Sequence, residues 1–332
     1  MTTSDIKRRS LLSLALGATV AGRARADEIV DVTVTVSSTS FVLGGVRIGE
    51  QSGLFTKNGI RPRIVVMDSG NAAMSALISH SGQFAVAGPG EVLAARARGL
   101  DVVVVASLYR GFAGYVVLGK AVAAKLPARP DSPQRERLKA LDGLSLAVPS
   151  ATSALLAPVR TAIQDAGGKA RFPYMAQPAM VAALETGAID GMVAAFPFAG
   201  TPILKGTGVA WIDGPGGDLP AFALPASSST LHAAADYVAA NGDTVRRFQL
   251  ALVDVGTFIH AHPDEARAAL AKGYPDLRAE EIDLAFKAQK ENWTRPFLSV
   301  EDLRHELALL KSSTNLPGLD GIDVAKLLVP PP

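Results

Sequence analysis

A stretch of the chain, residues 64–87, recurs later in the sequence as residues 171–194. Leu77 aligns with Leu184, an offset of 107 residues, and Val86 meets Val193 without a gap. Each copy has an apolar, strand-like run, a loop of small or polar residues, and a helix rich in Ala, Met and Leu. A Gly-containing turn and a second apolar run follow. The repetition predicts one strand–helix–strand unit that is used twice.

A second similarity lies upstream of each copy. The apolar runs 32–36 and 144–148 each end in a loop rich in Ser and Thr, at 37–40 and 149–153, and a helix is expected after each loop. We therefore expect an α/β protein of two Rossmann-like lobes. Ligands of open parallel sheets bind outside the carboxyl ends of the strands. If the lobes face each other, these loops line one ligand cleft between them.

The order of the elements assigns residues 27–113 plus 222–332 to lobe 1 and residues 114–221 to lobe 2. Two crossings between the lobes predict a hinge that closes around a ligand. We expect a strand over 222–227 that returns to lobe 1, and a helical pattern from Leu231 onward. Helices are predicted over residues 41–55, 245–260, 263–271, 279–289 and 300–310.

Residues 1–26 have the features of an export signal. Lys7, Arg8 and Arg9 precede a mildly apolar run, and Ala24-Arg25-Ala26 is a small-x-small cleavage site. The paired arginines resemble a twin-arginine signal, although Ser10-Leu11-Leu12 replaces the usual Phe. The apolar run is shorter than the roughly 20 residues that span a bilayer. We expect export to the periplasm with cleavage after Ala26.

Cleavage would change the net charge of the chain. The signal contains five of the 33 basic residues and one of the 31 acidic residues, which leaves 28 and 30 and a net charge of −2. The sequence therefore gives no indication of a nucleic-acid partner. With 0 Cys, the chain has no disulfide, no thiolate metal site and no cysteine for a lipid anchor. We expect a free monomer without membrane insertion.

Four segments resemble motifs of a known family: residues 53–60, 76–87, 141–148 and 183–191. In order and spacing they are similar to the periplasmic substrate-binding proteins of ABC importers with the type II fold. The most similar branch contains binders of sulfonates, taurine, nitrate and thiamine-pyrimidine precursors. The resemblance implies a small-molecule ligand, an ABC permease and ATPase as partners, and no cofactor, metal or catalytic residue. Gln83 and Pro149-Ser150 depart from the family pattern, so no single ligand is implied.

The expected cleft contains features that favour different ligands. Helix N-termini at 38–41 and 150–153 favour an anion such as a sulfonate, carboxylate or nitrate, unless the hydroxyls only cap their own helices. Glu91 favours an amino-heterocycle if it faces the cleft rather than only the helix dipole. Arg110 favours an acidic group, unless it is a hinge or surface arginine.

The candidate ligand-binding residues share a position in or beside these loops. They are Ser38, Thr39, Ser40, Phe41, Ser69, Gly70, Asn71, Gly88, Glu91, Tyr109, Arg110, Ser150, Thr152, Ser153, Gln177 and Phe196. Among the aromatic residues near the loops, which also include Phe112, Tyr174 and Phe198, we expect two or three to stack on a flat ligand.

Two alternatives to an importer protein remain at this stage. An enzyme is disfavoured, because His260-Ala261-His262 lacks metal-ligand spacing and the sequence has no Gly-x-Ser-x-Gly or phosphate-loop motif. A ligand-sensing accessory domain of a membrane receptor would use the same binding chemistry, so the residues do not separate it from an importer component.

Overall fold

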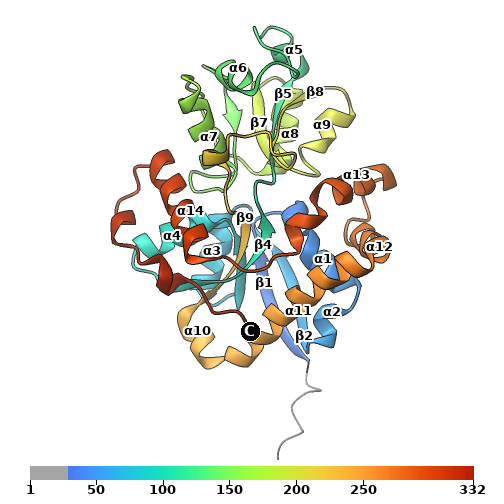
Figure 1. The fold of residues 1–332 in the computed structure, drawn as a ribbon, viewed down its shortest axis with the longest axis vertical. Helices are drawn as coiled ribbons and strands as arrows, with labels where there is room; N and C mark the ends of the chain where they lie inside the picture. Colours follow the sequence, from blue (N-terminus) through green and yellow to red (C-terminus); the bar gives the residue numbers. More distant parts are fainter. Residues whose placement is uncertain (1–28) are drawn as a thin grey trace, which may run out of the picture.

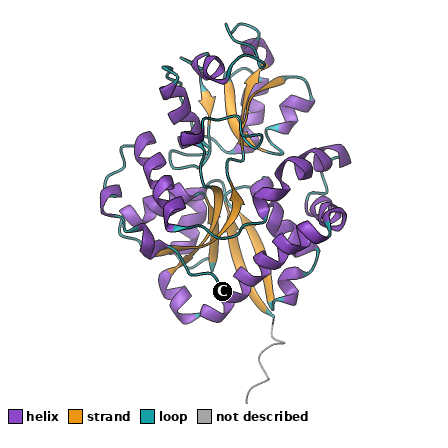
Figure 2. Ribbon diagram, in the orientation of Figure 1, coloured by secondary structure: helices purple, strands orange, loops and turns teal. Residues whose placement is uncertain are grey.

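The computed structural model describes residues 29–332, which form two lobes (Figure 1). Each lobe has its own β-sheet, and helices surround both sheets (Figure 2). The predicted export signal, residues 1–26, lies outside the described residues. Within 29–332, no helix is long and apolar enough to cross a membrane, and no group of three or more His, Cys, Asp or Glu side chains is placed to hold a metal ion.

The first sheet has five strands in the order β2-β1-β3-β9-β4. β1 pairs in parallel with β2 and β3, whereas β9 runs antiparallel to both of its neighbours. The backbone NH of Val329, near the C-terminus, donates to the carbonyl of Val104 on the edge strand β4. The strands span Val30–Val36 (β1), Ile60–Val66 (β2), Phe84–Ala87 (β3), Val102–Arg110 (β4) and Ser227–Ala234 (β9).

The second sheet repeats this plan. Its order is β6-β7-β5-β8, with β5 antiparallel to β7 and β8. Residues 171–174 extend the sheet beyond β6 through parallel bridges from Ser145 to Arg171 and from Val148 to Tyr174. The strands span Gly114–Gly119 (β5), Leu146–Ala147 (β6), Gly191–Ala195 (β7) and Gly208–Asp213 (β8). Both sheets are mixed rather than wholly parallel. In each sheet the first strand after a crossing between the lobes, β9 in the first lobe and β5 in the second, runs antiparallel to its neighbours.

The repeated unit of the sequence is confirmed. Helix α3, Gly70–Ile78, and helix α8, Gln177–Glu185, begin and end 107 residues apart. The following strands β3 and β7 also begin 107 residues apart. The loop after β1 contacts the start of α8, and the loop after β6 contacts the start of α3, so the duplicated loops meet crosswise at the lobe junction.

The strand that returns to the first lobe begins later than the sequence pattern predicts. Residues 221–223 form a 3₁₀ turn, η2, and β9 begins at Ser227 and continues to Ala234. The helical pattern expected from Leu231 is therefore wrong for 231–234. Every residue of β9 is buried, because the strand lies between β3 and β4 with both faces covered. A run of Ser, Thr and Ala in that position has none of the polar–apolar alternation that identifies a strand.

The helices after β9 agree with the sequence pattern within a few residues. α10 spans Ala235–Ala240, α11 Gly242–Ala261, α12 Pro263–Gly273, α13 Ala279–Gln289 and α14 Val300–Ser313. Ser299 caps α14 by accepting from the backbone NH of Asp302. The single helix expected over 41–55 is instead three pieces, 41–43, 44–51 and 54–57, and Gly53, with a left-handed φ of 75°, separates the second from the third.

The remaining helical segments are short. They are η1 (Phe41–Leu43), α1 (Gly44–Gln51), α2 (Leu54–Lys57), α4 (Pro89–Ala97), α5 (Lys120–Ala123), α6 (Gln134–Lys139), α7 (Leu156–Asp165), α9 (Gly200–Leu204), η3 (Lys290–Trp293), η4 (Leu319–Gly321) and η5 (Val324–Leu327).

Phe41 is buried where the two lobes meet. Its ring stacks on Phe196 of the second lobe at 6.2 Å between centroids and meets Tyr274 edge-on at 4.6 Å. Its backbone NH donates to the Phe196 carbonyl at 2.7 Å, and its carbonyl accepts from the Trp293 indole at 2.9 Å. The η1 turn, which leads into α1, is thus packed against the second lobe and the C-terminal helices.

Substitution of Gly44 by Ala is expected to destabilise the protein. A Cβ at Gly44 would overlap the indole ring of Trp293, and overpacking of this kind costs about 1–3 kcal/mol. Urea unfolding should show the loss as a lower midpoint. Gly321→Ala is the control, because a Cβ there meets no other atom. Equal midpoints for the two variants would contradict the packing argument.

Candidate functional site

The loops at the carboxyl ends of the strands of both lobes enclose one cavity. From the first lobe they are the loops after β1, β2 and β3; from the second lobe they are the loop after β6, the start of α8 and the end of β7. The cavity volume is about 40 Å³, little more than the space of one water molecule. Its lining consists of Ser37, Ser38, Ser40, Val42, Gly70, Ala87, Gly88, Glu91, Pro149, Ser153, Ala154, Leu155, Gln177, Ala195, Ser228 and Ser229.

The small volume reflects a cleft whose two walls touch. The Ser150 hydroxyl donates to Glu91 Oε1 at 3.3 Å, and the Thr152 hydroxyl donates to Asn71 Oδ1 at 3.4 Å. A Cβ at Gly90 would overlap the Thr152 carbonyl. These contacts join residues of opposite lobes, so a ligand of more than a few atoms enters only after the lobes separate.

Glu91 is buried in this cleft at the start of α4. It is 4% exposed, and its Oε2 atom has no hydrogen-bond partner in the described chain. A Cβ at Gly70 would lie 2.7 Å from Oε1 and one at Gly88 would lie 2.8 Å from Oε2, so the two glycines leave the space that the carboxyl occupies. Burial raises the pKa of Glu91 from 4.5 to about 8, although the Ser150 hydroxyl lowers it in part.

Ser40 supplies a second polar atom without a partner. Its Oγ is buried, lines the cavity and makes no hydrogen bond among residues 29–332. Ser40 occupies the N-cap position of η1, but its side chain does not cap that turn. The structure thus separates the two roles considered for this hydroxyl. Since it does not cap its own helix, it remains available to a ligand.

Gln177 holds the second-lobe wall and also reaches the first lobe. Its Oε1 accepts from the backbone NH of Ala195 at 2.8 Å, while its Nε2 donates to the Ser38 hydroxyl at 3.0 Å. The Ser38 hydroxyl also accepts from the backbone NH of Ser40. The amide of Gln177 is therefore a bridge across the cleft.

The structure places seven of the sixteen candidate residues in the cavity lining: Ser38, Ser40, Gly70, Gly88, Glu91, Ser153 and Gln177. Four more lie directly behind or beside the lining. Asn71, Ser150 and Thr152 form the lobe-to-lobe hydrogen bonds, and Thr39 lies in the same loop as Ser38 and Ser40. The predicted meeting of these loops is thus observed, and their contact with a ligand remains a prediction.

Phe41, Phe196 and Tyr109 do not line the cavity. The first two rings stack on each other behind the cleft wall, and the Tyr109 ring is fully buried with its hydroxyl donating to Gln289 Oε1 at 3.1 Å. All three rings are used in packing in this closed form, and their contact with a flat ligand stays a prediction.

Arg110 and Ser69 are also occupied elsewhere. Arg110 forms a two-point ion pair with Asp302, with N–O distances of 3.1 and 3.2 Å, at the end of β4 where the chain leaves for the second lobe. Ser69 caps α3 by accepting from the backbone NH of Ala72. The hinge-arginine and helix-cap interpretations hold for these two residues, so the cleft has no guanidinium.

The helix N-terminus expected at 150–153, which would favour an anion, does not lie in the cleft. The loop 150–153 does not begin a helix directly, because α7 starts at Leu156. Ser153 instead accepts from the backbone NH of Leu155 within the loop. Among the lining residues Glu91 is the one ionisable side chain, and none is basic. The electrostatics of the cavity therefore favour N–H donors over anions.

Sequence reasoning missed Ser228 and Ser229 of β9. Both line the cavity, and Ser228 binds the hinge by donating to the Gly111 carbonyl and accepting from the Ala113 NH. The available signal was the unusual run Ser227-Ser228-Ser229-Thr230, which is too polar for an ordinary central strand. Glu306 accepts from the Ser227 NH at 2.9 Å, which ties α14 to the same crossing.

Comparison with protein families shows that the sequence model described as NMT1/THI5 like matches residues 41–266. A search of curated proteins finds no match. Among solved structures, the alkanesulfonate-binding protein SsuA from Xanthomonas axonopodis pv. citri, bound to MOPS, is similar with a TM-score of 0.70 and 17% identity. The match covers 91% of this chain and 99% of that one.

Two further structures show the same likeness. The periplasmic aliphatic sulphonate binding protein SsuA from Escherichia coli has a TM-score of 0.65 and 17% identity, over 90% of this chain and 98% of that one. The periplasmic nitrate-binding protein NrtA from Synechocystis PCC 6803 has a TM-score of 0.69 and 14% identity, over 92% and 87%. These similarities confirm the predicted two-lobed binding-protein fold.

The free energy of unfolding is expected to fall as pH rises from about 6.5 to 8. Burial raises the pKa of both Glu91 and Glu306 from 4.5 to about 8. In this interval the folded protein keeps protons that the unfolded chain has released, so stability is lost as pH approaches the folded value. Each group contributes at most about 1.4 kcal/mol per pH unit. Urea unfolding at several pH values measures the slope.

Glu91→Gln mimics the neutral acid and should remove about half of this slope, and Glu306→Gln the other half. Buried His232, whose pKa is lowered from 6.5 to about 4, changes stability in the opposite direction and mainly below this interval. Identical slopes in the wild type and both variants would show that the two carboxyls are not protonated in the folded protein.

Gly90→Ala is expected to hold the lobes apart. The added Cβ would overlap the Thr152 carbonyl across the cleft, whereas Ala itself favours helix α4. Small-angle X-ray scattering should give a larger radius of gyration for the variant than for the wild type, with no loss of thermal stability. Gly242→Ala is the control, since a Cβ there meets nothing. A radius unchanged in both variants would mean that the cleft does not close in solution.

Proposed function

Because the chain belongs to the NMT1/THI5-like family, we propose that it is a periplasmic solute-binding protein that delivers a small organic ligand to an ABC importer. Family membership and the sulfonate- and nitrate-binding structural neighbours agree with the resemblance drawn from the sequence motifs. The predicted export signal over residues 1–26, with cleavage after Ala26, supports the compartment. An ABC permease with its ATPase is the proposed partner, and the protein acts as a monomer by binding without chemistry.

The observation that carries the proposal is a closed cleft with two unsatisfied polar atoms in its lining. Ser40 Oγ and Glu91 Oε2 are buried and have no partner among residues 29–332. A buried polar group without a hydrogen bond costs about 1–3 kcal/mol. A ligand that bonds to both atoms removes this cost in the closed form alone. This difference in affinity between open and closed forms is what drives closure.

We propose that the ligand carries N–H donors, as an amino-heterocycle does. Glu91 is the ionisable residue of the lining, and Arg110, the basic residue expected there, is paired with Asp302. The structural neighbours are named for sulfonate and nitrate, which are anions. An anion in the cavity would meet no basic side chain, and Glu91 would repel it whenever that carboxyl is ionised. A ring N–H or amino group instead stabilises the ionised carboxylate and lowers its pKa.

Isothermal titration calorimetry of residues 27–332 should therefore detect aminopyrimidines or related amino-heterocycles and not alkanesulfonates or nitrate. Glu91→Gln is expected to weaken the binding of the hit by roughly tenfold to a hundredfold, because a hydrogen bond to a charged group is worth about 1.5–3 kcal/mol. Because binding is expected to lower the pKa of Glu91, the wild type should also release protons on binding near pH 8, and the variant should not.

Glu136→Gln is the matched control, since it makes the same change on the exposed surface of α6 in the second lobe. It should bind as the wild type does. Tight binding of a sulfonate or nitrate with equal affinity in the Glu91 variant would overturn the proposed ligand class while leaving the binding function intact. Turnover of a bound compound would overturn the binding function itself.

A further inference from the structure

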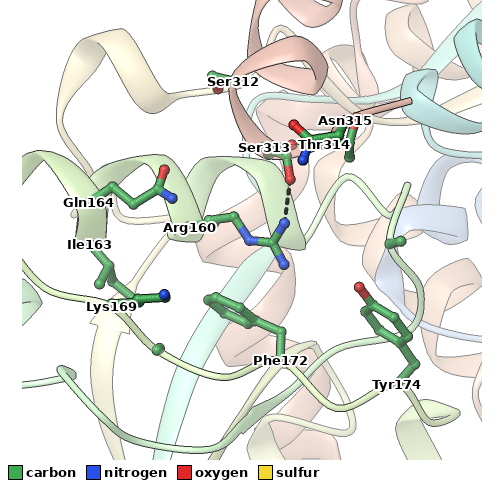
Figure 3. Close-up of a pocket in the computed structure, with 12 residues that line it drawn as sticks. Arg160, Ile163, Gln164, Lys169, Phe172, Tyr174, Ser312, Ser313, Thr314 and Asn315 are labelled. Carbon is green, nitrogen blue, oxygen red and sulfur yellow. Dashed lines mark hydrogen bonds between the residues drawn. The ribbon is translucent and has the colours of Figure 1, made fainter. Parts of the chain in front are cut away.

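A second cavity lies at the side of the lobe junction, outside the cleft (Figure 3). Its volume is about 510 Å³, which is large enough for a drug-sized molecule. Helix α7 and residues 169–174 of the second lobe form one side, and the end of α14 with residues 312–315 forms the other. Ala151 also lines it, so the loop 149–155 separates this side pocket from the cleft.

The side pocket is lined by basic side chains, which the cleft lining lacks. Arg160 and Lys169 are its ionisable lining residues apart from the Tyr174 phenol, and no carboxylate lines it. The Lys169 ammonium group has no ion pair or hydrogen bond with any described residue. This local excess of positive charge occurs in a chain whose expected mature net charge is −2. An anion is the ligand that such a lining favours.

The Arg160 guanidinium is held in a defined position. It lies over the Phe172 ring, 5.0 Å from the centroid, and donates through one nitrogen to the Ser313 carbonyl (Figure 3). The stacking and this one bond fix the plane of the group and leave other N–H donors without a protein partner. A planar guanidinium with free donors binds a carboxylate through two parallel hydrogen bonds.

Aromatic and amide groups complete the lining. The Tyr174 ring is 54% exposed at the mouth of the pocket, where a large ring normally gains by burial. Gln164 and Asn315 present amide groups from the two opposite sides (Figure 3). Packing between α7 and α14 accounts for the position of Arg160. It does not account for an unpaired Lys169 and an exposed Tyr174 at the same cavity.

We propose that the side pocket is a second ligand site, which binds a small aromatic carboxylate. The carboxylate group would lie between Arg160 and Lys169, and the ring would pack against Tyr174. This inference concerns residues outside the cleft and does not depend on the identity of the transported ligand. The chain thus has two cavities of opposite preference: N–H donors in the cleft and organic anions at its side.

The test uses benzoate as the probe and benzamide as its neutral counterpart, with residues 27–332 labelled for NMR. Benzoate should shift the amide signals of residues 160–174 and 312–315 and leave those of 88–91 unchanged, whereas benzamide should bind at least about tenfold more weakly. Lys169→Gln should weaken benzoate binding by about tenfold, and Tyr174→Ala should weaken both probes.

Lys125→Gln provides the matched control, because Lys125 is an exposed lysine of the same lobe outside both cavities. It should leave benzoate binding unchanged. Equal losses in the Lys169 and Lys125 variants would mean that only general charge attraction acts. No shift at 160–174, or shifts confined to the cleft loops, would also overturn the proposal. Because both variants replace exposed residues, they are expected to fold, and their amide spectra report this directly.

Discussion

The junction formed by Ser40 and Phe41 determines how the rest of the structure is arranged. The Ser40 carbonyl accepts from the Tyr274 hydroxyl, and the Phe41 carbonyl accepts from the Trp293 indole. The Phe41 NH donates across the lobes to Phe196. The backbone groups of the two residues are therefore fixed by the second lobe and the C-terminal helices, while the buried Ser40 hydroxyl has no partner among residues 29–332.

At the lobe junction, apolar residues form the packed contact and polar residues line the cleft beside it. Phe41, Phe196 and Tyr115 form a continuous aromatic contact between the lobes, with Tyr115 and Phe196 5.5 Å apart. Because this contact supplies the apolar area of the interface, the neighbouring cleft can be lined with Ser, Gly and one carboxyl. Gly70, Gly88 and Gly90 then allow the opposite walls to come within contact distance.

The repetition in the sequence was sufficient to predict the two lobes, because strand and helix periods report the burial pattern directly. It predicted the offset of 107 residues at which α3 and α8 begin and end. The return strand was predicted over 222–227 instead of Ser227–Ala234, since Ser227–Thr230 is a polar run whose burial depends on strands β3 and β4 on either side. For the site, it identified the loops and Glu91 but could not tell which side chains were occupied. Arg110 forms an ion pair with Asp302, which lies 192 residues later, and a local sequence pattern does not predict such a partner.

The charge of the cleft follows from that distant pairing rather than from composition. Asp302 lies in the first turn of α14 and accepts hydrogen bonds from both terminal nitrogens of Arg110. Glu306, one turn further along, accepts from the Ser227 NH at the second crossing. The hinge thereby uses Arg110 for its own structure. Glu91 is left as the ionisable group of the binding wall, with burial holding its pKa near 8. A ligand that supplies an N–H donor, as proposed, would bond to Glu91 without disturbing the hinge, whereas pairing an anion with Arg110 would break the ion pair that connects β4 to α14.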